Sequence, residues 1–249
     1  MFSSLWYQSG RILAKRYAQL AFHPHIEMRA PLPEGAKILA ANHPSTVDPV
    51  MLTTLTREPV SILISETLFK VPLLGTGLRW GGHITVRHSN GKACLEEALQ
   101  RLRDGRAVGI FPEGAISPLK GGSPLKGGSP LKGGSPLQGG CHRAHTGVAR
   151  LALASGAPVV PVGISIDRQR VWLTKTMVDG REETGTWYLS GPYAITVGEP
   201  MRFEGSVEDR ERVREVADLI MQRINQLAHA SELRAAAAAH SAAGAWRAA

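Results

Sequence analysis

The seven residues NHPSTVD, from Asn42 to Asp48, contain two side chains that can act together in acid–base chemistry. His43 precedes Asp48 by five residues, and histidine ordinarily has the pKa nearest neutrality, so it can take a proton from a hydroxyl. A carboxylate on the other ring nitrogen would fix the tautomer and stabilise the imidazolium. Each residue also has a structural interpretation, because Asp48 before Pro49 is a good helix N-cap and His43 can be an ordinary loop histidine. The motif alone favours neither reading.

Strands that alternate with helices must position this motif. The apolar run KILAAN directly before it predicts a buried strand over 37–42, and PVVPVGISI over 158–166 is apolar throughout, which indicates burial on both faces. Further strands are expected at 60–65, 84–88, 107–111 and in YAITVGEPMRF. Helices are expected at 49–56, 92–103, 146–155 and after Ser206. Ser206 and Asp209 together resemble a capping box at the start of that last helix. We therefore predict an α/β fold with a largely parallel sheet flanked by helices.

The N-terminal segment predicts an amphipathic helix. Its apolar residues recur at helical spacing and its cations lie between them; they are Phe2, Leu5, Trp6, Ile12, Leu13, Tyr17 and Leu20, with Arg11, Lys15 and Arg16. Such a helix can lie in a membrane interface or pack on the domain's own surface, and the periodicity favours neither. No apolar run reaches the roughly 18 residues that span a bilayer, and the segment lacks the features of a signal peptide.

Composition narrows the class of partner. The chain has 249 residues with a formal net charge of +8, which fits one domain and a phosphate-bearing partner: nucleic acid, an anionic membrane or a phosphorylated substrate. No nucleic-acid-binding signature is present, so no nucleic acid is expected. Cys94 and Cys141 lack metal-ligand spacing, which predicts a reduced, cytosolic compartment and no metal site.

Four ordered blocks between Lys37 and Glu199 resemble the glycerolipid acyltransferases, the family of bacterial 1-acylglycerol-3-phosphate acyltransferases. The blocks are NHPSTVD, GGHITVR (81–87), FPEGAIS (111–117) and VPVGI (160–164). The resemblance implies transfer of a fatty acyl group from acyl-CoA or acyl carrier protein to a lysophospholipid hydroxyl, most simply that of 1-acylglycerol-3-phosphate. It implies His43 as general base, Asp48 as its orienting partner, and no cofactor.

The resemblance also implies residues that bind the acceptor. Arg87 would bind the phosphate, Glu113 a glycerol hydroxyl, and Gly114 would let the backbone approach the ligand. Ala115 and Ile116 replace the usual Thr and Arg of the third block, Val86 occupies an often acidic position, and His145 stands where Lys is usual, although it can still donate to phosphate. These departures leave the acceptor open, so another hydroxylated lipid is an alternative.

A repeated hexapeptide, SPLKGG, interrupts the domain after the third block. Removing three copies would leave a connection like that of the family, so we interpret 117–140 as a loop insertion beside the chemistry. The predicted organisation is an N-terminal helix and linker (1–33), an acyltransferase domain (34–230) and an Ala-rich tail (231–249). With the helix and the LFKVPLL segment dipping into one leaflet, the expected location is peripheral, on the cytoplasmic face of a membrane. The alternative from another class is a non-catalytic basic membrane-binding module.

Overall fold

The computed structural model describes residues 2–87, 90–114, 116, 144–178 and 181–247. The repeat at 117–140, together with Ala115 and Cys141, lies outside the described residues. Strands are β1 (His25–Met28), β2 (Lys37–Ala41), β3 (Val60–Ser65), β4 (Ile84–Val86), β5 (Ala107–Ile110), β6 (Val159–Ile166), β7 (Val171–Val178), β8 (Arg181–Tyr188) and β9 (Tyr193–Val197). Helices are α1 (Phe2–Phe22), α2 (Asp48–Thr54), α3 (Glu66–Lys70), α4 (Leu74–Trp80), α5 (Gly91–Arg103), α6 (Gly147–Ser155) and α7 (Arg210–Arg247), with a 3-10 turn at Arg168–Arg170.

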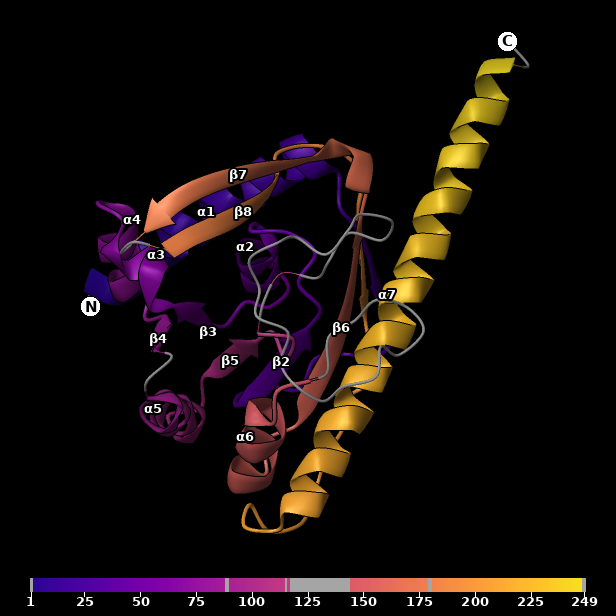
Figure 1. Cartoon of the computed structure of the whole chain (residues 1–249). Helices are drawn as coiled ribbons and strands as arrows, with labels where there is room; N and C mark the ends of the chain where they lie inside the picture. Colours follow the sequence, from indigo (N-terminus) through magenta and orange to yellow (C-terminus); the bar gives the residue numbers. More distant parts are fainter. Residues whose placement is uncertain (1, 88–89, 115, 117–143, 179–180, 248–249) are drawn as a thin grey trace.

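Seven of the described strands form one sheet in the order β1-β9-β6-β2-β5-β3-β4 (Figure 1). Every neighbouring pair is parallel except β6 with β9. The predicted largely parallel α/β fold is therefore confirmed. The chemistry-bearing blocks follow β2, β4 and β5, and the carboxyl ends of parallel strands meet at one edge of the sheet.

Both faces of the sheet are covered by helices, because successive strand residues point to opposite faces. In β2, Ile38 and Ala40 join the core that α5, α6 and α7 cover, whereas Leu39 and Ala41 join the core on the side of α1 and α2. All five residues of β2 are buried, as the apolar run predicts. The strand that leads into NHPSTVD is thus fixed from both sides.

Two predicted helix ends have different outcomes. Gly156 closes α6 with a left-handed φ of 63°, and its N–H donates to the Ala152 carbonyl at 2.9 Å, as expected of a C-terminal glycine. At the start of α7, Asp209 rather than Ser206 is the cap. Its Oδ1 accepts the N–H groups of Glu211 and Arg212, each at 3.0 Å. The predicted capping box is wrong by three residues because Asp209 alone satisfies the first free donors of the helix.

Helix α1 packs on the domain through a face that the sequence pattern does not single out. Tyr7, Ala18 and Phe22 are buried, while members of the predicted apolar stripe remain exposed: Ile12 by 59%, Leu13 by 72% and Leu20 by 79%. Packing on the domain therefore does not account for the stripe. In the part of the chain that the structure describes, no helix is both long and apolar enough to cross a bilayer.

Strands β7 and β8 form an antiparallel hairpin that the sequence analysis does not predict. It is a separate two-stranded sheet, and in Figure 1 it arches over the edge of the domain beside α1, with its far end towards α3 and α4. Trp172 lies directly opposite Trp187 in its register. Helix α7 continues to Arg247, well into the segment expected to be a separate tail.

Candidate active site

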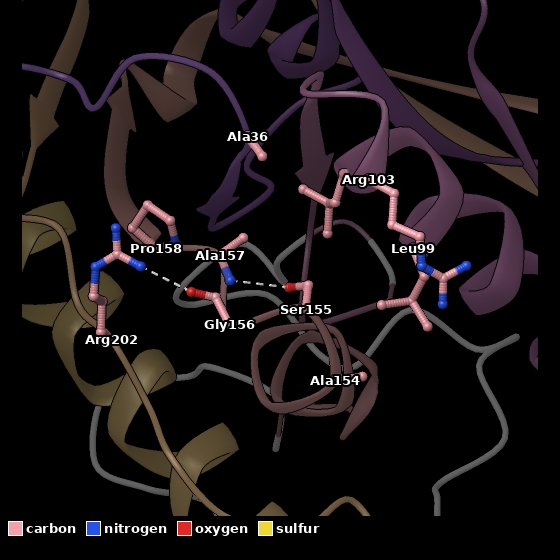
Figure 2. A pocket seen from close by; sticks show the side chains of 10 residues that line it. Ala36, Leu99, Arg103, Ala154, Ser155, Gly156, Ala157, Pro158 and Arg202 are labelled. Carbon is pink, nitrogen blue, oxygen red and sulfur yellow. Dashed lines mark hydrogen bonds between the residues drawn. The ribbon is translucent and has the colours of Figure 1, made fainter.

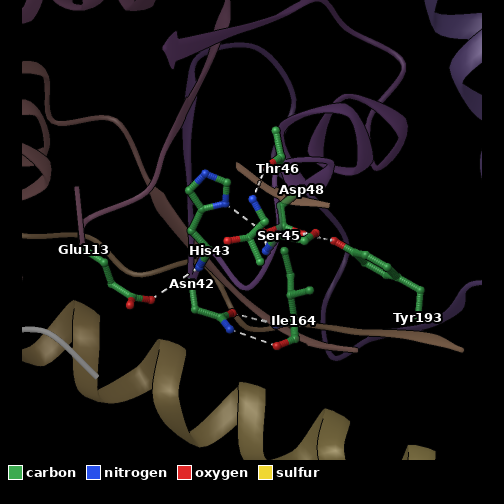
Figure 3. Close-up of polar contacts among 9 residues, drawn as sticks. Asn42, His43, Ser45, Thr46, Asp48, Glu113, Ile164 and Tyr193 are labelled. Carbon is green, nitrogen blue, oxygen red and sulfur yellow. Dashed lines mark hydrogen bonds and ion pairs between the residues drawn. The ribbon is translucent and has the colours of Figure 1, made fainter. Parts of the chain in front are cut away.

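The loop between β2 and α2 brings His43 onto Asp48 (Figure 3). The His43 Nδ1 lies 2.9 Å from Asp48 Oδ2, and the side chains are 16% and 0% exposed. Because a carboxylate only accepts hydrogen bonds, the imidazole proton belongs on Nδ1 in this arrangement. The lone pair of the other nitrogen, Nε2, is then directed away from Asp48 and is available to a substrate hydroxyl.

Asp48 accepts three more hydrogen bonds. Ser45 donates its backbone N–H to Oδ2 at 2.7 Å and its hydroxyl to Oδ1 at 2.6 Å, and the Tyr193 hydroxyl donates to Oδ1 at 2.6 Å. The N-cap of α2 is Val47, and Asp48 turns its carboxylate back towards His43. The N-cap interpretation of Asp48 is therefore wrong, because the buried carboxylate finds its donors in the loop and in β9.

Tyr193 is held as a hydrogen-bond donor. Complete burial raises the pKa of its phenol well above the ordinary value, and the neighbouring Asp48 carboxylate raises it further. The phenol therefore keeps its proton and directs it at Asp48. A protonated tyrosine beside a fully buried carboxylate helps compensate for the water that the carboxylate has lost.

Phe111 and Asn42 fix the ring and the loop that carry the acid–base pair. The rings of His43 and Phe111 stack with centroids 4.2 Å apart and an interplanar angle of 21°. The Asn42 side chain donates to the Ile164 carbonyl at 2.9 Å and accepts the Ile164 N–H at 2.7 Å, which joins the loop to β6. The imidazole is thus held by an aromatic face on one side and by a hydrogen bond at its edge.

Glu113 lies beneath this loop. Its side chain is 2% exposed, and its Oε1 accepts the backbone N–H of His43 at 3.4 Å (Figure 3). Gly114 has a left-handed φ of 68°, and a Cβ there would come within 2.7 Å of the His145 ring. The backbone N–H of His145 in turn donates to the Pro112 carbonyl at 2.7 Å. The structure thus brings His43, Asp48, Glu113, Gly114 and His145 together.

Arg87 is separate from this group. It follows β4, which is the last strand in the order of the sheet. Because β4 is three strand spacings of about 4.8 Å from β2, the two strands lie about 14 Å apart. Its side chain is 63% exposed and its Nε lies 3.6 Å from Glu66 Oε2. Arg87 therefore lies at the same end of the sheet as His43, where the parallel strands have their carboxyl ends, but it does not contact His43. A phosphate bound by Arg87 would be separated from His43 along this end of the sheet.

Four residues that hold the acid–base pair or its loop were not assigned by sequence reasoning. Asn42, Ser45 and Phe111 lie inside the quoted blocks, so their proximity to the acid–base pair could have been inferred from those motifs. Tyr193 lies 145 residues after Asp48. No local pattern links the two positions, because the contact depends on β9 joining the sheet beside β6.

A surface pocket lies at the opposite edge of the sheet, where β2 and β6 begin (Figure 2). Arg103 and Arg202 are its charged lining residues, and Arg202 is held by a hydrogen bond of 2.9 Å to the Gly156 carbonyl. Its lining offers neither a carboxylate nor an imidazole for proton transfer. Among the residues that the structure describes, no three His, Cys, Asp or Glu side chains gather as metal ligands would.

Comparison with known proteins gives the family. The acyltransferase family model matches residues 23–165, more than half of the chain, and this range contains His43, Asp48, Arg87, Glu113 and His145. The chain belongs to the acyltransferase family, which confirms the resemblance.

The individual relatives either match only part of this chain or have low sequence identity to it. The chain is 35% identical over 80 residues to a Borreliella burgdorferi protein named 1-acyl-sn-glycerol-3-phosphate acyltransferase, and the match spans 31% of this chain and about a third (32%) of that relative. The crystal structure of PlsC from Thermotoga maritima, a 1-acyl-sn-glycerophosphate acyltransferase, matches with a TM-score of 0.57 at 19% identity. That match covers 89% of this chain and 79% of the other, and it shows a shared fold.

Proposed function

We propose that this protein transfers an acyl group from a thioester of coenzyme A or acyl carrier protein to a lysophospholipid hydroxyl, with 1-acylglycerol-3-phosphate as the expected acceptor. The observation that carries the proposal is the contact between His43 and the fully buried Asp48 in a chain of the acyltransferase family. The printed names of the two relatives support the choice of acceptor.

The geometry supports a direct transfer without an acyl-enzyme. The acceptor oxygen attacks the thioester carbonyl carbon while His43 Nε2 takes the hydroxyl proton. Asp48, on Nδ1, stabilises the imidazolium that forms. When the tetrahedral intermediate collapses, the carbon–sulfur bond breaks and the departing thiolate receives the proton from His43. Each atom is accounted for by donor, acceptor and one imidazole, so the proposal includes no resident cofactor or metal.

We also propose that the protein acts at the surface of a membrane, on its cytoplasmic face, where both the acceptor and the product reside. The exposed stripe of α1 supports this, and so does the turn between α3 and α4. In that turn Leu73 is 89% exposed with a left-handed φ of 64°, and Leu74 and Val71 are 46% and 41% exposed. Apolar side chains held out into water at such a turn fit a lipid interface.

Replacing the imidazole tests the mechanism. We expect His43→Ala to lower the rate of acyl transfer by about 10³-fold, because general-base catalysis contributes on that order. Transfer of labelled acyl groups to 1-acylglycerol-3-phosphate measures the effect, and His229→Ala, with a 67% exposed side chain on α7, is the matched control. Equal transfer by wild type and His43→Ala would contradict the assigned base. A non-catalytic membrane-binding module would show no transfer at all.

Acceptor recognition is tested at Arg87. We expect Arg87→Ala to raise the acceptor KM about tenfold while the donor KM changes little, because a guanidinium–phosphate contact is charge-assisted. Arg87→Lys retains the charge and should recover part of the affinity. An equal loss with a non-phosphorylated acceptor would contradict the phosphate role. It would indicate instead that the ion pair with Glu66 serves the structure.

A further inference from the structure

The outer face of the β7–β8 hairpin presents two exposed tryptophans side by side. Trp172 and Trp187 are directly opposite in the antiparallel register and are 70% and 38% exposed. The Trp187 indole N–H donates to Thr174 Oγ1 at 2.9 Å, and a Cβ on Gly185 would lie 2.6 Å from that nitrogen. The ring is therefore fixed flat along the strand with its polar atom satisfied and part of its surface in water. Exposed paired indoles of this kind do not serve the domain's own core.

This face continues onto α1. Leu189, two residues after Trp187, is 55% exposed, and its carbonyl accepts the Tyr17 hydroxyl at 2.8 Å. Tyr17 is itself 41% exposed and belongs to the α1 stripe with Leu13 and Leu20. A second hydrogen bond, from the Gly191 N–H to the Ala21 carbonyl at 2.9 Å, fastens the base of the hairpin to the helix. We call this set the hairpin–helix surface: Trp172, Trp187, Leu189, Tyr17, Leu13 and Leu20.

Positive charges border the hairpin–helix surface along α1 and at the base of the hairpin, whereas the start of β8 contains Glu182 and Glu183. Exposed Lys15 and Arg16 lie on α1, whose sequence contains no acidic residue, and Arg168 and Arg170 lie at the base of the hairpin. Arg170 also pairs with Asp167, at 3.2 Å. Apolar and aromatic side chains bordered by cations are complementary to an anionic bilayer, where rings lie at headgroup depth and cations meet phosphate. This combination favours a lipid surface over a protein partner, whose buried interface core is depleted of lysine.

The free edge of the same strand is joined to the catalytic loop. Thr186, which precedes Trp187, is 5% exposed; its carbonyl accepts the Thr46 N–H at 2.8 Å and its N–H donates to Thr46 Oγ1 at 3.2 Å. These bonds use the backbone of Thr186, so they lie in the plane of the hairpin, at the edge of β8 that does not face β7. The loop that carries His43 and Asp48 is thus attached to the residue next to the outward-facing Trp187.

We propose that the β7–β8 hairpin is a membrane-docking element, and that its tryptophan pair inserts together with the exposed stripe of α1 into the headgroup region of an anionic bilayer. Docking in this orientation holds the catalytic loop beside the lipid surface, so that a lipid acceptor reaches His43 without leaving the membrane. The inference rests on the proposed function for its purpose. Its test measures vesicle binding alone and contains no acyl donor, so the docking proposal and the proposed acyl transfer can fail separately.

Vesicle binding of the full chain tests the proposal. The probe is phosphatidylcholine vesicles with and without phosphatidylglycerol, measured by flotation and by quenching of tryptophan emission with brominated lipid. We expect Trp172→Ser to weaken partitioning onto the anionic vesicles by about tenfold, because burial of an aromatic ring is lost. Quenching in the wild type should exceed that in Trp172→Ser by the contribution of the inserted indole. Leu13→Ser combined with Leu20→Ser should weaken binding independently.

The matched control is Leu233→Ser, which removes a 58% exposed leucine from α7 and should leave vesicle binding unchanged. Trp172 is so exposed that its replacement should not unfold the chain, and an unchanged thermal midpoint verifies this. Wild-type binding by Trp172→Ser, or an emission from Trp172 that brominated lipid does not quench, would overturn the proposal. A dimer that dissociates in Trp172→Ser would also overturn it and assign the surface to a second copy of the chain.

Discussion

At the level of single residues, the site is built around a carboxylate that has no access to water. Asp48 is fully buried, and it receives hydrogen bonds from the Ser45 amide and hydroxyl and from Tyr193 in addition to its contact with His43. A buried charge is tolerated only with such partners. The orientation of His43 therefore depends on residues that have no chemical role of their own.

Tyr193 should act as a positioning residue. We expect Tyr193→Phe to lower kcat about tenfold, because a hydrogen bond to a buried carboxylate is lost, while the acceptor KM stays unchanged. A residue that only positions the base lowers kcat without changing the acceptor KM, whereas a residue that binds the acceptor raises KM. Steady-state kinetics with varied acceptor concentration measure both values.

The control for this prediction is Tyr188→Phe. Tyr188 also lies in the core and donates its hydroxyl to a backbone carbonyl, that of Pro192, at 2.7 Å, without contacting Asp48. Tyr188→Phe should lower the free energy of unfolding by about 1 kcal/mol and leave kcat unchanged. If both variants lowered kcat equally, Tyr193 would have a structural role only.

At this scale the sequence predicts the pair but not its surroundings. The proximity of His43 to Asp48 follows from the short spacing in NHPSTVD, and Glu113 joins them because β5 and β2 are neighbours in a parallel sheet. The direction of the Asp48 carboxylate could not be predicted, since Asp-Pro is equally compatible with an N-cap. Arg87 illustrates the same limit, because order along the chain does not give distance across the sheet.

At the level of elements, α7 is pressed directly onto β6 and so supports the strand beside β2. A Cβ on Gly163 would lie 2.1 Å from the backbone of Leu227 and Ala228. Ser231, fully buried, donates to the Gly163 carbonyl at 3.0 Å and bonds Thr196 of β9 at 2.7 Å. The glycine is needed here for close approach between a helix backbone and a strand backbone.

Gly163→Ala should therefore destabilise the protein by about 3 kcal/mol, because neither backbone can move aside without disturbing the sheet. Urea unfolding followed by circular dichroism measures this. Gly10→Ala is the matched control: no atom lies within 4 Å of its Cβ, and alanine in a helix interior should stabilise by up to about 1 kcal/mol. A loss below 1 kcal/mol at Gly163 would contradict the close contact.

The elements that the sequence predicts are those with one dominant periodicity. Strands such as β3 and helices such as α6 have apolar patterns that only one structure satisfies. The β7–β8 hairpin has no such pattern, because the large apolar side chains of Trp172 and Trp187 are exposed while the polar Thr186 is buried. When a strand has apolar residues on its exposed face, its sequence pattern does not indicate which face is buried. The docking proposal explains why these apolar residues are exposed.

At the level of the whole molecule, the fold buries a histidine that charges on acidification. His83, which directly precedes β4, accepts the backbone N–H of Ile62 in β3 on its Nδ1 at 3.2 Å. Burial, together with a smaller contribution from the nearby Arg106 cation, lowers the pKa of His83 from 6.5 to about 4. Between these two values the unfolded chain binds a proton that the folded protein excludes.

The stability contributed by neutral His83 is thus fully present above pH 6.5 and is lost as the pH falls towards 4. We expect the free energy of unfolding of the wild type to decrease by roughly 1 kcal/mol for each unit of pH across this window. His83→Gln cannot titrate and should show a shallower slope, so the two stabilities approach each other on acidification. Urea unfolding at a series of pH values measures both curves, with the exposed His229→Gln as control. Parallel curves for wild type and His83→Gln would contradict this, because they would show that His83 has the same pKa in the folded and the unfolded chain.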